Sequence, residues 1–288
     1  MPFENGTFTV ALFSLPQDLP ENYMDLLDAN RAGDVDLVKD EPEVGWTSGR
    51  CLLDSKIEPQ TVLWNNLVYV CLRKAERKVP SSMLKAWCQR EELVWMRANE
   101  RDSVPSKQKK QIKEEVIEKN LMSVPPTLSS IPAVIDADNH MLYLGAGSPA
   151  QIDLFLEYFV RTFKFEPQQI NPEYYCETEF QTHADELPVI EFSARADGET
   201  VPGRDFLTWL WYFSEQETGG ALEVPEVGEC AFTVEGPLTF ALAGEADGAA
   251  ENTLKNGNSP LRAAEAKAAL SVGKKLKKAK FYLEHENK

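Results

Sequence analysis

A long polar stretch lies between two apolar, strand-like segments of this chain, and it limits the folds that the chain can adopt. Asn66–Arg73 and Ala133–Asp136 have the apolar and β-branched content of buried strands, whereas residues 81–119 carry only a thin apolar stripe. Pro80 and Pro105 mark the starts of two helices within this stretch. Because helices so poor in apolar side chains pack on one side only, the sequence predicts a projecting helical hairpin.

The two hairpin helices have recognisable boundaries. Pro80–Ser82 offers N-cap chemistry for a helix that runs to about Arg101, and Pro105–Ser106 starts a second helix that runs through Lys119. The polar residues Asn99–Val104 form the turn between them. The predicted hairpin therefore has a charged tip and leaves its basic side free.

The rest of the chain alternates between strand and helix patterns. Further strands are predicted at Phe8–Phe13, Met141–Leu144, Val189–Ala194, Glu229–Val234, Leu238–Ala243 and Lys277–Leu283. Further helices are predicted at Asn22–Asn30, Ser148–Phe163, Gly203–Glu217 and Ala263–Ser271. Turn signals predict hairpin turns at Ala137–His140 and Glu235–Pro237, a loop at Gly244–Gly257 and a helix C-cap at Gly273. This order predicts an α+β fold with antiparallel sheets and helices packed against them.

The domain organisation follows from the same pattern. Residues 1–78 and 133–288 are predicted to form a central α+β body, with a break between two subdomains near residues 166–186. Residues 79–132 are predicted to be the projecting hairpin and a return segment that is rich in proline. A chain of 288 residues has ample material for a core in either arrangement.

Cysteine and histidine usage argues against metal sites and disulfides. The five cysteines are widely spaced without a C-x-x-C pair, and the three histidines have no metal-ligand spacing. Met1–Gly6 lacks the basic start and long apolar core of a signal peptide, and no apolar run reaches the roughly 18 residues of a membrane helix. The sequence predicts a cytoplasmic protein with reduced thiols, no membrane contact, no metal and no cofactor.

The charge of the chain is unevenly distributed. The net charge is -16, yet Arg73–Lys119 holds thirteen basic against eight acidic residues, and Arg262–Lys280 holds seven against Glu265 alone. Lysine and arginine gathered in this way can neutralise a phosphate backbone and release its counterions. The plainer interpretation is a solvated helix face and a basic segment near the end of the chain.

No catalytic signature stands out. Asp136-x-Asp138 is the best acidic pair for a two-metal nuclease, but Asp138 lies in a predicted turn, where aspartate is favoured for turn chemistry. Ser148 follows a glycine-rich segment that lacks the lysine of a P-loop, so helix capping explains it better. Trp209, Trp211 and Tyr212 are suited to stacking on bases, but on an apolar helix they are more often core.

Several blocks in a fixed order resemble the RdgC family of recombination-associated proteins. These blocks are Gly45-Trp46, NLVYVCLRKAERKVPSSMLK from Asn66, KQIKEEVIEKNLM from Lys110 and VIDADNHMLYL from Val134. The resemblance covers roughly residues 7 to 165 and continues weakly through GRDFLTWLWYFSE from Gly203 and EAKAALSVGKKLKKAKF from Glu265. It implies a curved subunit of a homodimer that closes as a ring around duplex DNA. It also implies sequence-independent, nucleoid-associated binding that restrains a recombinase.

The resemblance carries over to particular residues and fails at others. Arg73 and Lys74 match the family's Arg-Lys pair at a strand end, and Lys109 and Lys113 match basic positions of the following helix. In the last block, Gly273 and Lys274 match a Gly-Lys pair before the final core strand.

Two departures concern the hairpin. Asp102–Pro105 stands where the family has a more densely basic tip, and Val124–Thr127 stands where relatives have an aromatic residue that latches two subunits. The resemblance therefore predicts a weaker latch between subunits here than in relatives.

Charge and resemblance together predict a DNA-facing surface in two patches. The first consists of Arg73, Lys74, Arg77, Lys78, Lys109, Lys110 and Lys113. The second consists of Lys274, Lys275, Lys277 and Lys278. The predicted function is a non-enzymatic duplex clamp that modulates recombination. The alternatives are a divergent metal-dependent DNA exonuclease and an acidic surface that serves a protein partner.

Overall fold

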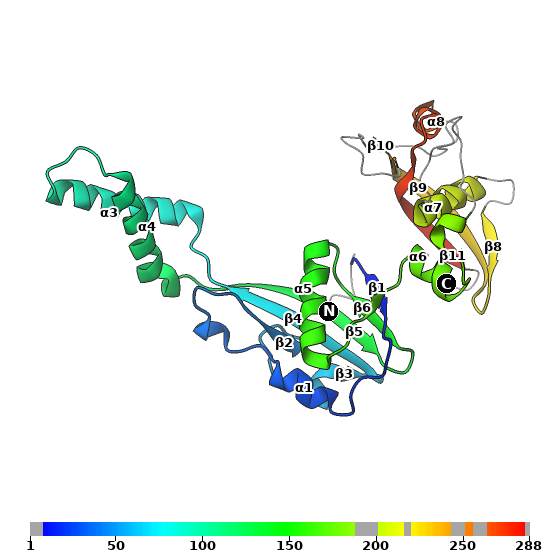
Figure 1. The fold of residues 1–288 in the computed structure, drawn as a ribbon, viewed down its shortest axis with the longest axis horizontal. Helices are drawn as coiled ribbons and strands as arrows, with labels where there is room; N and C mark the ends of the chain where they lie inside the picture. The colour runs from blue at the N-terminus through cyan, green and yellow to red at the C-terminus, as the bar shows by residue number, and fades with distance from the viewer. Residues whose placement is uncertain (1–7, 188–200, 216–219, 243–250, 256–263, 286–288) are drawn as a thin grey trace. The chain divides into compact units, whose positions relative to one another are not determined.

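The structure is a computed structural model that describes residues 8–187, 201–215, 220–242, 251–255 and 264–285. The chain divides into two units, Met1–Gln169 and Ile170–Lys288, each of which has its own antiparallel sheet. Helices pack against both sheets, so the predicted α+β class is confirmed (Figure 1).

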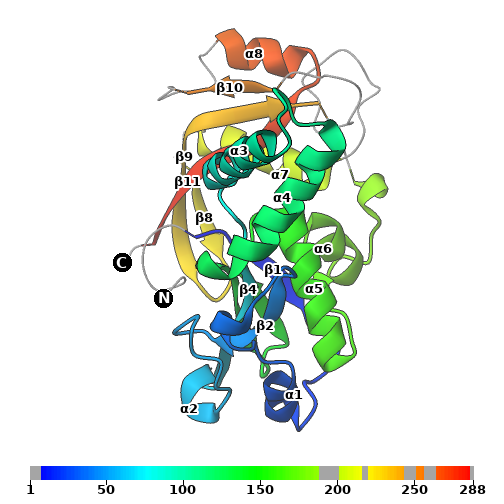
Figure 2. The same ribbon diagram turned by 90° about the vertical axis from the view of Figure 1, so that its left-hand side faces the viewer.

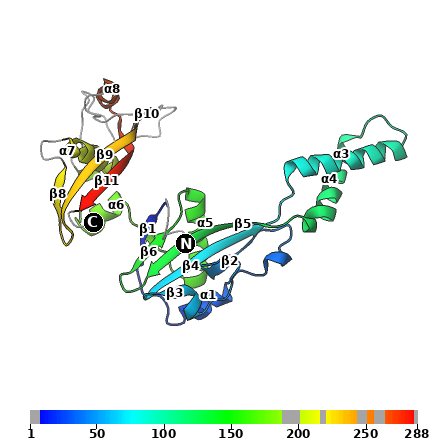
Figure 3. The ribbon, with the colours of Figure 1, turned by 180° about the vertical axis from the view of Figure 1, so that it is seen from behind.

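The first unit is built on a seven-stranded antiparallel sheet in the order β2-β4-β5-β6-β1-β7, with β3 paired to β4. The strands are β1 (Ala11–Ser14), β2 (Glu43–Ser48), β3 (Leu63–Trp64), β4 (Leu67–Glu76), β5 (Thr127–Asp136), β6 (Met141–Leu144) and β7 (Gln168–Gln169). The helices outside the hairpin are α1 (Tyr23–Ala29), the 3-10 turn η1 (Val35–Leu37), α2 (Pro59–Val62) and α5 (Pro149–Phe163). Figures 1 and 3 show α1 and α5 together on one face of the sheet.

Aromatic packing under α5 forms the main core. The Trp46 ring meets Phe155 edge-on with centroids 5.5 Å apart, and both side chains are fully buried. The indole Nε1 of Trp46 donates to Thr162 Oγ1 at 2.9 Å, which satisfies its polar atom inside the core. Gly45 is required beside it, because a Cβ at this position would lie 2.4 Å from the Cα of Ala32.

The predicted helical hairpin is present: it follows β4 and precedes β5 along the chain (Figure 1), and its two helices face the viewer in Figure 2. It consists of α3 (Ser81–Ala98), α4 (Ser106–Asn120) and the 3-10 turn η2 (Leu121–Ser123). Val104, Ile112 and Val116 form a small core of its own, separate from the one beneath the sheet. Capping by Ser81 or Ser82 is wrong, because Pro80 occupies the N-cap position and no side chain caps α3.

The proline-rich return is shorter than predicted. β5 already begins at Thr127 and pairs with β4 from Glu76↔Thr127 to Val68↔Ile135. Pro132 therefore lies within the sheet, opposite Cys71, rather than in a loop. Its carbonyl still accepts from the Gly145 amide, at 2.8 Å.

The second unit has a four-stranded antiparallel sheet in which β9 pairs with all three neighbours. Its strands are β8 (Ala221–Val224), β9 (Gly228–Ala241), β10 (Asn252–Leu254) and β11 (Lys275–His285). Its helices are α6 (Pro172–Thr178), the 3-10 turn η3 (Ala184–Glu186), α7 (Pro202–Ser214) and α8 (Ala264–Ser271). Trp211 of α7 and Phe240 of β9 are buried in its core.

Two predictions for this unit are wrong. Glu235–Pro237 is no turn, because β9 runs through it without a break. The partners on β11 jump there from Lys280↔Glu235 to Lys278↔Thr239, so a β-bulge accommodates the proline, which has no N–H for the ladder. The predicted loop Gly244–Gly257 contains β10 among its described residues, and the predicted strand Val189–Ala194 lies outside the described residues.

Of two predictions about helices, one is confirmed and the other holds only in part. Gly273 has a φ of +84°, and its amide bonds to the Leu270 carbonyl, so the predicted C-cap is confirmed. The aromatic helix α7 is only half buried: Trp211 is core, whereas Phe206, Trp209 and Tyr212 are exposed. Trp209 stacks with Phe206 and with Phe213 instead.

Candidate nucleic-acid interface

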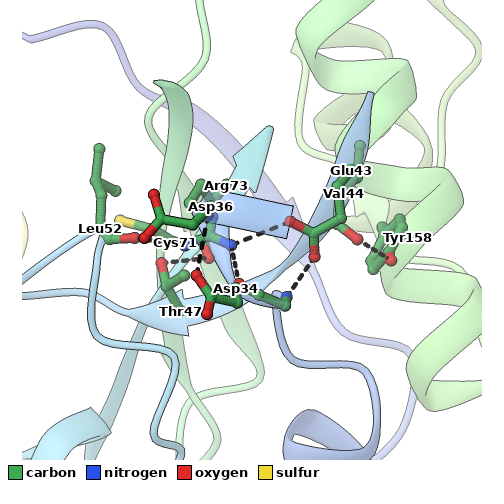
Figure 4. Close-up of polar contacts among 10 residues, drawn as sticks. Asp34, Asp36, Glu43, Val44, Thr47, Leu52, Cys71, Arg73 and Tyr158 are labelled. Atoms are coloured by element: carbon green, nitrogen blue, oxygen red, sulfur yellow. Dashed lines mark hydrogen bonds and ion pairs between the residues drawn. The ribbon is translucent and has the colours of Figure 1, made fainter. Parts of the chain in front are cut away.

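Arg73 lies inside the first unit, with 1% of its side chain exposed. Its guanidinium donates to the carbonyls of Leu52 at 3.1 Å and Gly33 at 2.5 Å, and it pairs with Glu43 at 3.1 Å (Figure 4). Behind it, burial raises the pKa of the Cys71 thiol to about 12. The prediction that Arg73 faces DNA conflicts with this geometry, and the side chain instead holds loops onto β4.

Arg77 is also buried, one residue beyond the end of β4, with 8% of its side chain exposed. Its Nε donates to Val38 O at 2.6 Å and its Nη2 to Asp36 O at 2.9 Å. Its Nη1 donates to Val124 O at 2.5 Å and to Met122 O at 3.4 Å. Four of the five N–H donors of this guanidinium thus bond to backbone carbonyls, and the side chain is buried, so it does not fit a phosphate contact.

The alternation of side chains between the two faces of the sheet explains why these two arginines are buried. Val68, Val70 and Leu72 point to the core beneath α5, so the residues between them point to the opposite face. On that face the segment Gly33–Val38 supplies carbonyls to both arginines, and Leu52 supplies another to Arg73. These covering segments are distant in sequence, so a strand pattern alone does not reveal them.

The lysines of α4 remain on the surface. Lys109, Lys110 and Lys113 are all exposed, on the turns that carry the inward-facing Ile112. Lys109 lies 3.8 Å from Glu92 of α3, and Lys110 lies 3.8 Å from Glu114. Such long, exposed ion pairs are weak, so phosphates can replace the carboxylates at little cost.

The remaining members of the first patch lie at the root of the hairpin. Lys78 is exposed, and Lys74 is half-exposed with an ion pair to Glu76 at 3.2 Å. With Arg73 and Arg77 buried, eleven of the thirteen basic residues of this segment remain against its eight acidic ones. Exposed basic residues of the hairpin that were not predicted as contacts are Lys85, Arg90, Arg97, Arg101, Lys107 and Lys119.

The second patch is largely engaged within its own unit. Lys275 is buried and pairs with Asp205 of α7 at 2.5 Å, so it does not fit a DNA-facing role. Lys277 pairs with Glu251 at 2.5 Å, and Lys274 donates to the side-chain oxygen of Asn252. Lys278 is exposed.

The acidic and hydroxyl side chains considered for catalysis form hydrogen bonds to residues close to them in the sequence. Asp136 accepts from the backbone N–H of Asn139 at 3.1 Å and from its side-chain amide at 2.8 Å, which is a turn role. Ser148 accepts from the Gln151 amide as the N-cap of α5. Within the described ranges, no group of three or more His, Cys, Asp and Glu side chains is arranged to hold a metal ion.

The resemblance also suggests the hairpin tip, Asn99–Val104, and the Pro125–Pro126 segment as contacts between two subunits, and these segments lie at opposite ends of α4. Asn99–Val104 joins α3 to α4, whereas Pro125–Pro126 precedes β5 at the root of the hairpin. The 15 residues of α4, at about 1.5 Å each, separate them by about 22 Å. A single contact surface therefore does not contain both segments unless it runs the length of the helix.

Comparison with known proteins adds one positive finding. A family model described as "RdgC: Putative exonuclease, RdgC" matches residues 12–180, which is more than half of the chain. The match covers the seven-stranded sheet, the hairpin and α6. No curated protein matches the chain. In the described part of the chain, none of the helices has the length and apolar content needed to cross a membrane.

Proposed function

The chain belongs to the RdgC family, and from this premise we propose that it is a non-sequence-specific DNA-binding protein that holds duplex DNA as a homodimer and modulates recombination. Family membership supports a recombination-associated DNA-binding role. The clamp, the dimer and the duplex preference are the finer parts of the proposal. Action in the cytoplasm, at the nucleoid, follows from the same role.

The observation that carries the proposal is the exposed lysine group on α4. Lys109, Lys110 and Lys113 are free of short ion pairs, and they stand on a helix that turns its apolar side toward α3. Two of the three match basic positions of the family. Lysines held loosely on a rigid helix contact phosphates without reading base edges, which suits sequence-independent binding.

The acidic composition is compatible with this role. A net charge of -16 repels DNA at a distance, so binding requires cations concentrated on one surface. A dimer with its basic hairpins turned inward and its acidic surface outward would meet that requirement. Lys74, Lys78 and Lys278 complete the proposed contact surface, whereas Arg73, Arg77 and Lys275 are left out of it because they are buried.

A two-fold dimer is the commonest oligomer of soluble proteins, and exposed apolar side chains on α3 supply a surface for one. Leu93 is 48% exposed and Val94 is 55% exposed. The hairpin tip, Asn99–Val104, lies beyond them at the end of the same helix. Light scattering over a range of concentrations should give twice the 32.4 kDa of one chain. A mass that stays at 32.4 kDa would exclude the ring.

DNA binding is tested by titrating linear and closed-circular duplexes of two unrelated sequences at several salt concentrations. Both sequences should bind equally, and the logarithm of affinity should fall with the logarithm of salt by about 0.9 for each phosphate neutralised. Weaker binding to closed circles than to linear duplex would support encirclement. An absent salt slope would instead favour a protein partner for this surface.

A metal-dependent exonuclease is the second candidate, because the family description names that activity. Asp136 and Asp138 would be the first ligands to consider, although the Asp136 carboxylate already accepts two hydrogen bonds from Asn139. We expect end-labelled duplex to stay intact with Mg²⁺ or Mn²⁺ present. Degradation that is lost in an Asp136→Asn, Asp138→Asn double variant would establish the exonuclease instead.

A further inference from the structure

One buried side chain, Arg77, bonds to several segments at the root of the helical hairpin. Arg77 lies in the segment that leads from β4 into α3, and its guanidinium reaches two other segments of the first unit. It donates to Asp36 O and Val38 O on one side and to Met122 O and Val124 O on the other. The entry to the hairpin, its exit and the loop beside the sheet therefore share a single cation.

The acceptors are backbone carbonyls, and this determines which side chain fits. A planar guanidinium presents five N–H groups in a fixed fork, which can reach four carbonyls from three directions at once. A lysine ammonium has three donors at one point and cannot span the same set. Arg77 forms no ion pair with the acidic side chains that the structure describes, so its bonds specify backbone position rather than charge balance.

The root of the hairpin also has the buried apolar side chains Val79 and Leu121, which make no directional bonds and belong to neither of the two cores. The hairpin core of Val104, Ile112 and Val116 is built from α3, α4 and their connecting loop, and it is separate from the core of the sheet. Packing within the hairpin thus holds the two helices to each other but does not orient them on the sheet. The paired strands β4 and β5 end at Glu76 and Thr127, just short of Arg77 and Val124.

We propose that Arg77 is a positioning residue that fixes the orientation in which the hairpin presents its lysines to DNA. This inference rests on the proposed function and assigns Arg77 to no phosphate contact. Orientation matters because a surface that is competent only part of the time binds with an affinity reduced by that fraction. A rigid root lets Lys109, Lys110 and Lys113 meet a phosphate backbone without first ordering the hairpin.

The decisive variant is Arg77→Lys, which keeps the charge and removes the fork. Its control is Arg50→Lys, at an exposed loop position of the same unit. We expect faster amide hydrogen exchange in residues 121–124 and in α3, with unchanged protection of Phe155–Phe163 in α5. Duplex affinity should fall about tenfold if the freed hairpin is correctly oriented about a tenth of the time, with an unchanged salt slope. The control should match the wild-type protein in every measurement.

Each alternative outcome has a distinct signature. Unchanged exchange at residues 121–124 would overturn the inference, and so would unchanged affinity in a protein that binds DNA. Loss of protection in α5 as well would show that Arg77 supports the whole unit rather than the hairpin. Arg77→Met adds a test of direct contact, because a salt slope that flattens by about 0.9 would make Arg77 a phosphate ligand. Wild-type protein that fails to bind DNA would refute the proposed function and leave the exchange result standing.

Discussion

The hairpin and the last strand carry similar charge excesses in sequence, yet they hold their cations differently. On α4, Lys109 lies 3.8 Å from the Glu92 carboxylate, and Lys110 lies 3.8 Å from the Glu114 carboxylate. On β11, Lys275 and Lys277 lie 2.5 Å from Asp205 and Glu251. The hairpin lysines can therefore exchange partners for phosphates, whereas the strand lysines must first give up close contacts.

This difference shows that the net charge of a segment does not tell which of its cations are available. Arg73 and Arg77 contribute to the basic count of the hairpin segment but are used inside the protein. A basic residue can stabilise the fold, orient an element or contact a ligand, and its surroundings decide which. Substitutions should therefore separate buried cations, which affect folding, from exposed ones, which affect binding.

The largest effect is expected from Arg73→Met. Removing the buried guanidinium leaves two backbone carbonyls without their donor and the partly exposed Glu43 without its cation, which should lower the free energy of unfolding by about 3 to 5 kcal/mol. Denaturant unfolding followed by tryptophan fluorescence measures this. The exposed Arg97→Met should change it by less than about 0.5 kcal/mol. Equal effects of the two substitutions would contradict the distinction between buried and exposed cations.

Lys275→Met should destabilise the second unit by about 3 kcal/mol, because it leaves the buried Asp205 carboxylate without its cation. Adding Asp205→Asn should recover much of the loss, since the uncompensated charge is then gone. Unfolding monitored by hydrogen exchange in α7 and β11 would report this unit separately. A double variant no more stable than Lys275→Met would argue against a charge-based cause.

DNA binding should distinguish the two patches directly. Replacing Lys109, Lys110 and Lys113 with alanine should flatten the salt slope by about 2.7 units and weaken binding to all sequences alike. The matched strand variant, Lys274, Lys277 and Lys278 to alanine, should flatten it by less than about one unit. Titrations over the same salt range measure both. Equal slopes for the two variants would place DNA on both patches.

The smallest effect is expected from Glu251→Gln, which frees Lys277. Duplex affinity should rise about twofold at low salt, because an exposed pair is weak. The hydrogen bond from Lys277 lowers the pKa of Glu251 below its ordinary 4.5, so the pair persists above that pH and is lost as pH falls through the lowered pKa. The gain should thus be constant near neutral pH and vanish in acid. A gain that varies between about pH 6 and pH 8 would implicate another group.

Locally encoded features of the fold could be predicted from the sequence. α5 has a continuous apolar stripe and a serine N-cap, and β4 has an uninterrupted β-rich run. The hairpin could be predicted because the stretch between two strands contains few apolar residues. In each case the signal lies in one continuous stretch of sequence and does not depend on what covers the element.

The incorrect predictions involve contacts between segments that are far apart in the sequence. Gly236–Pro237 has the composition of a turn, and only the bulge opposite it on β11 lets β9 continue. Arg73 lies within β4 and resembles a basic residue of the family, but the loop carbonyls that enclose it come from Gly33 and Leu52. Pro132 also has the composition of a loop, but it lies opposite Cys71 within the sheet. A single sequence does not show such contacts.

Because β11 lies at the edge of its sheet, its lysines also affect how two molecules can associate. In the described residues β11 pairs with β9 alone, so its other edge adjoins no strand. Near its start the Leu276 amide donates to Thr208 Oγ1 at 3.0 Å, and the rest of this edge is open to another strand. Such an edge can recruit a strand from a second molecule and start aggregation. Lys277, Lys278 and Lys280 oppose this, because two copies meeting at that edge would bring like charges together. The basic run would thus keep the protein dispersed at high concentration, whether or not DNA ever touches it.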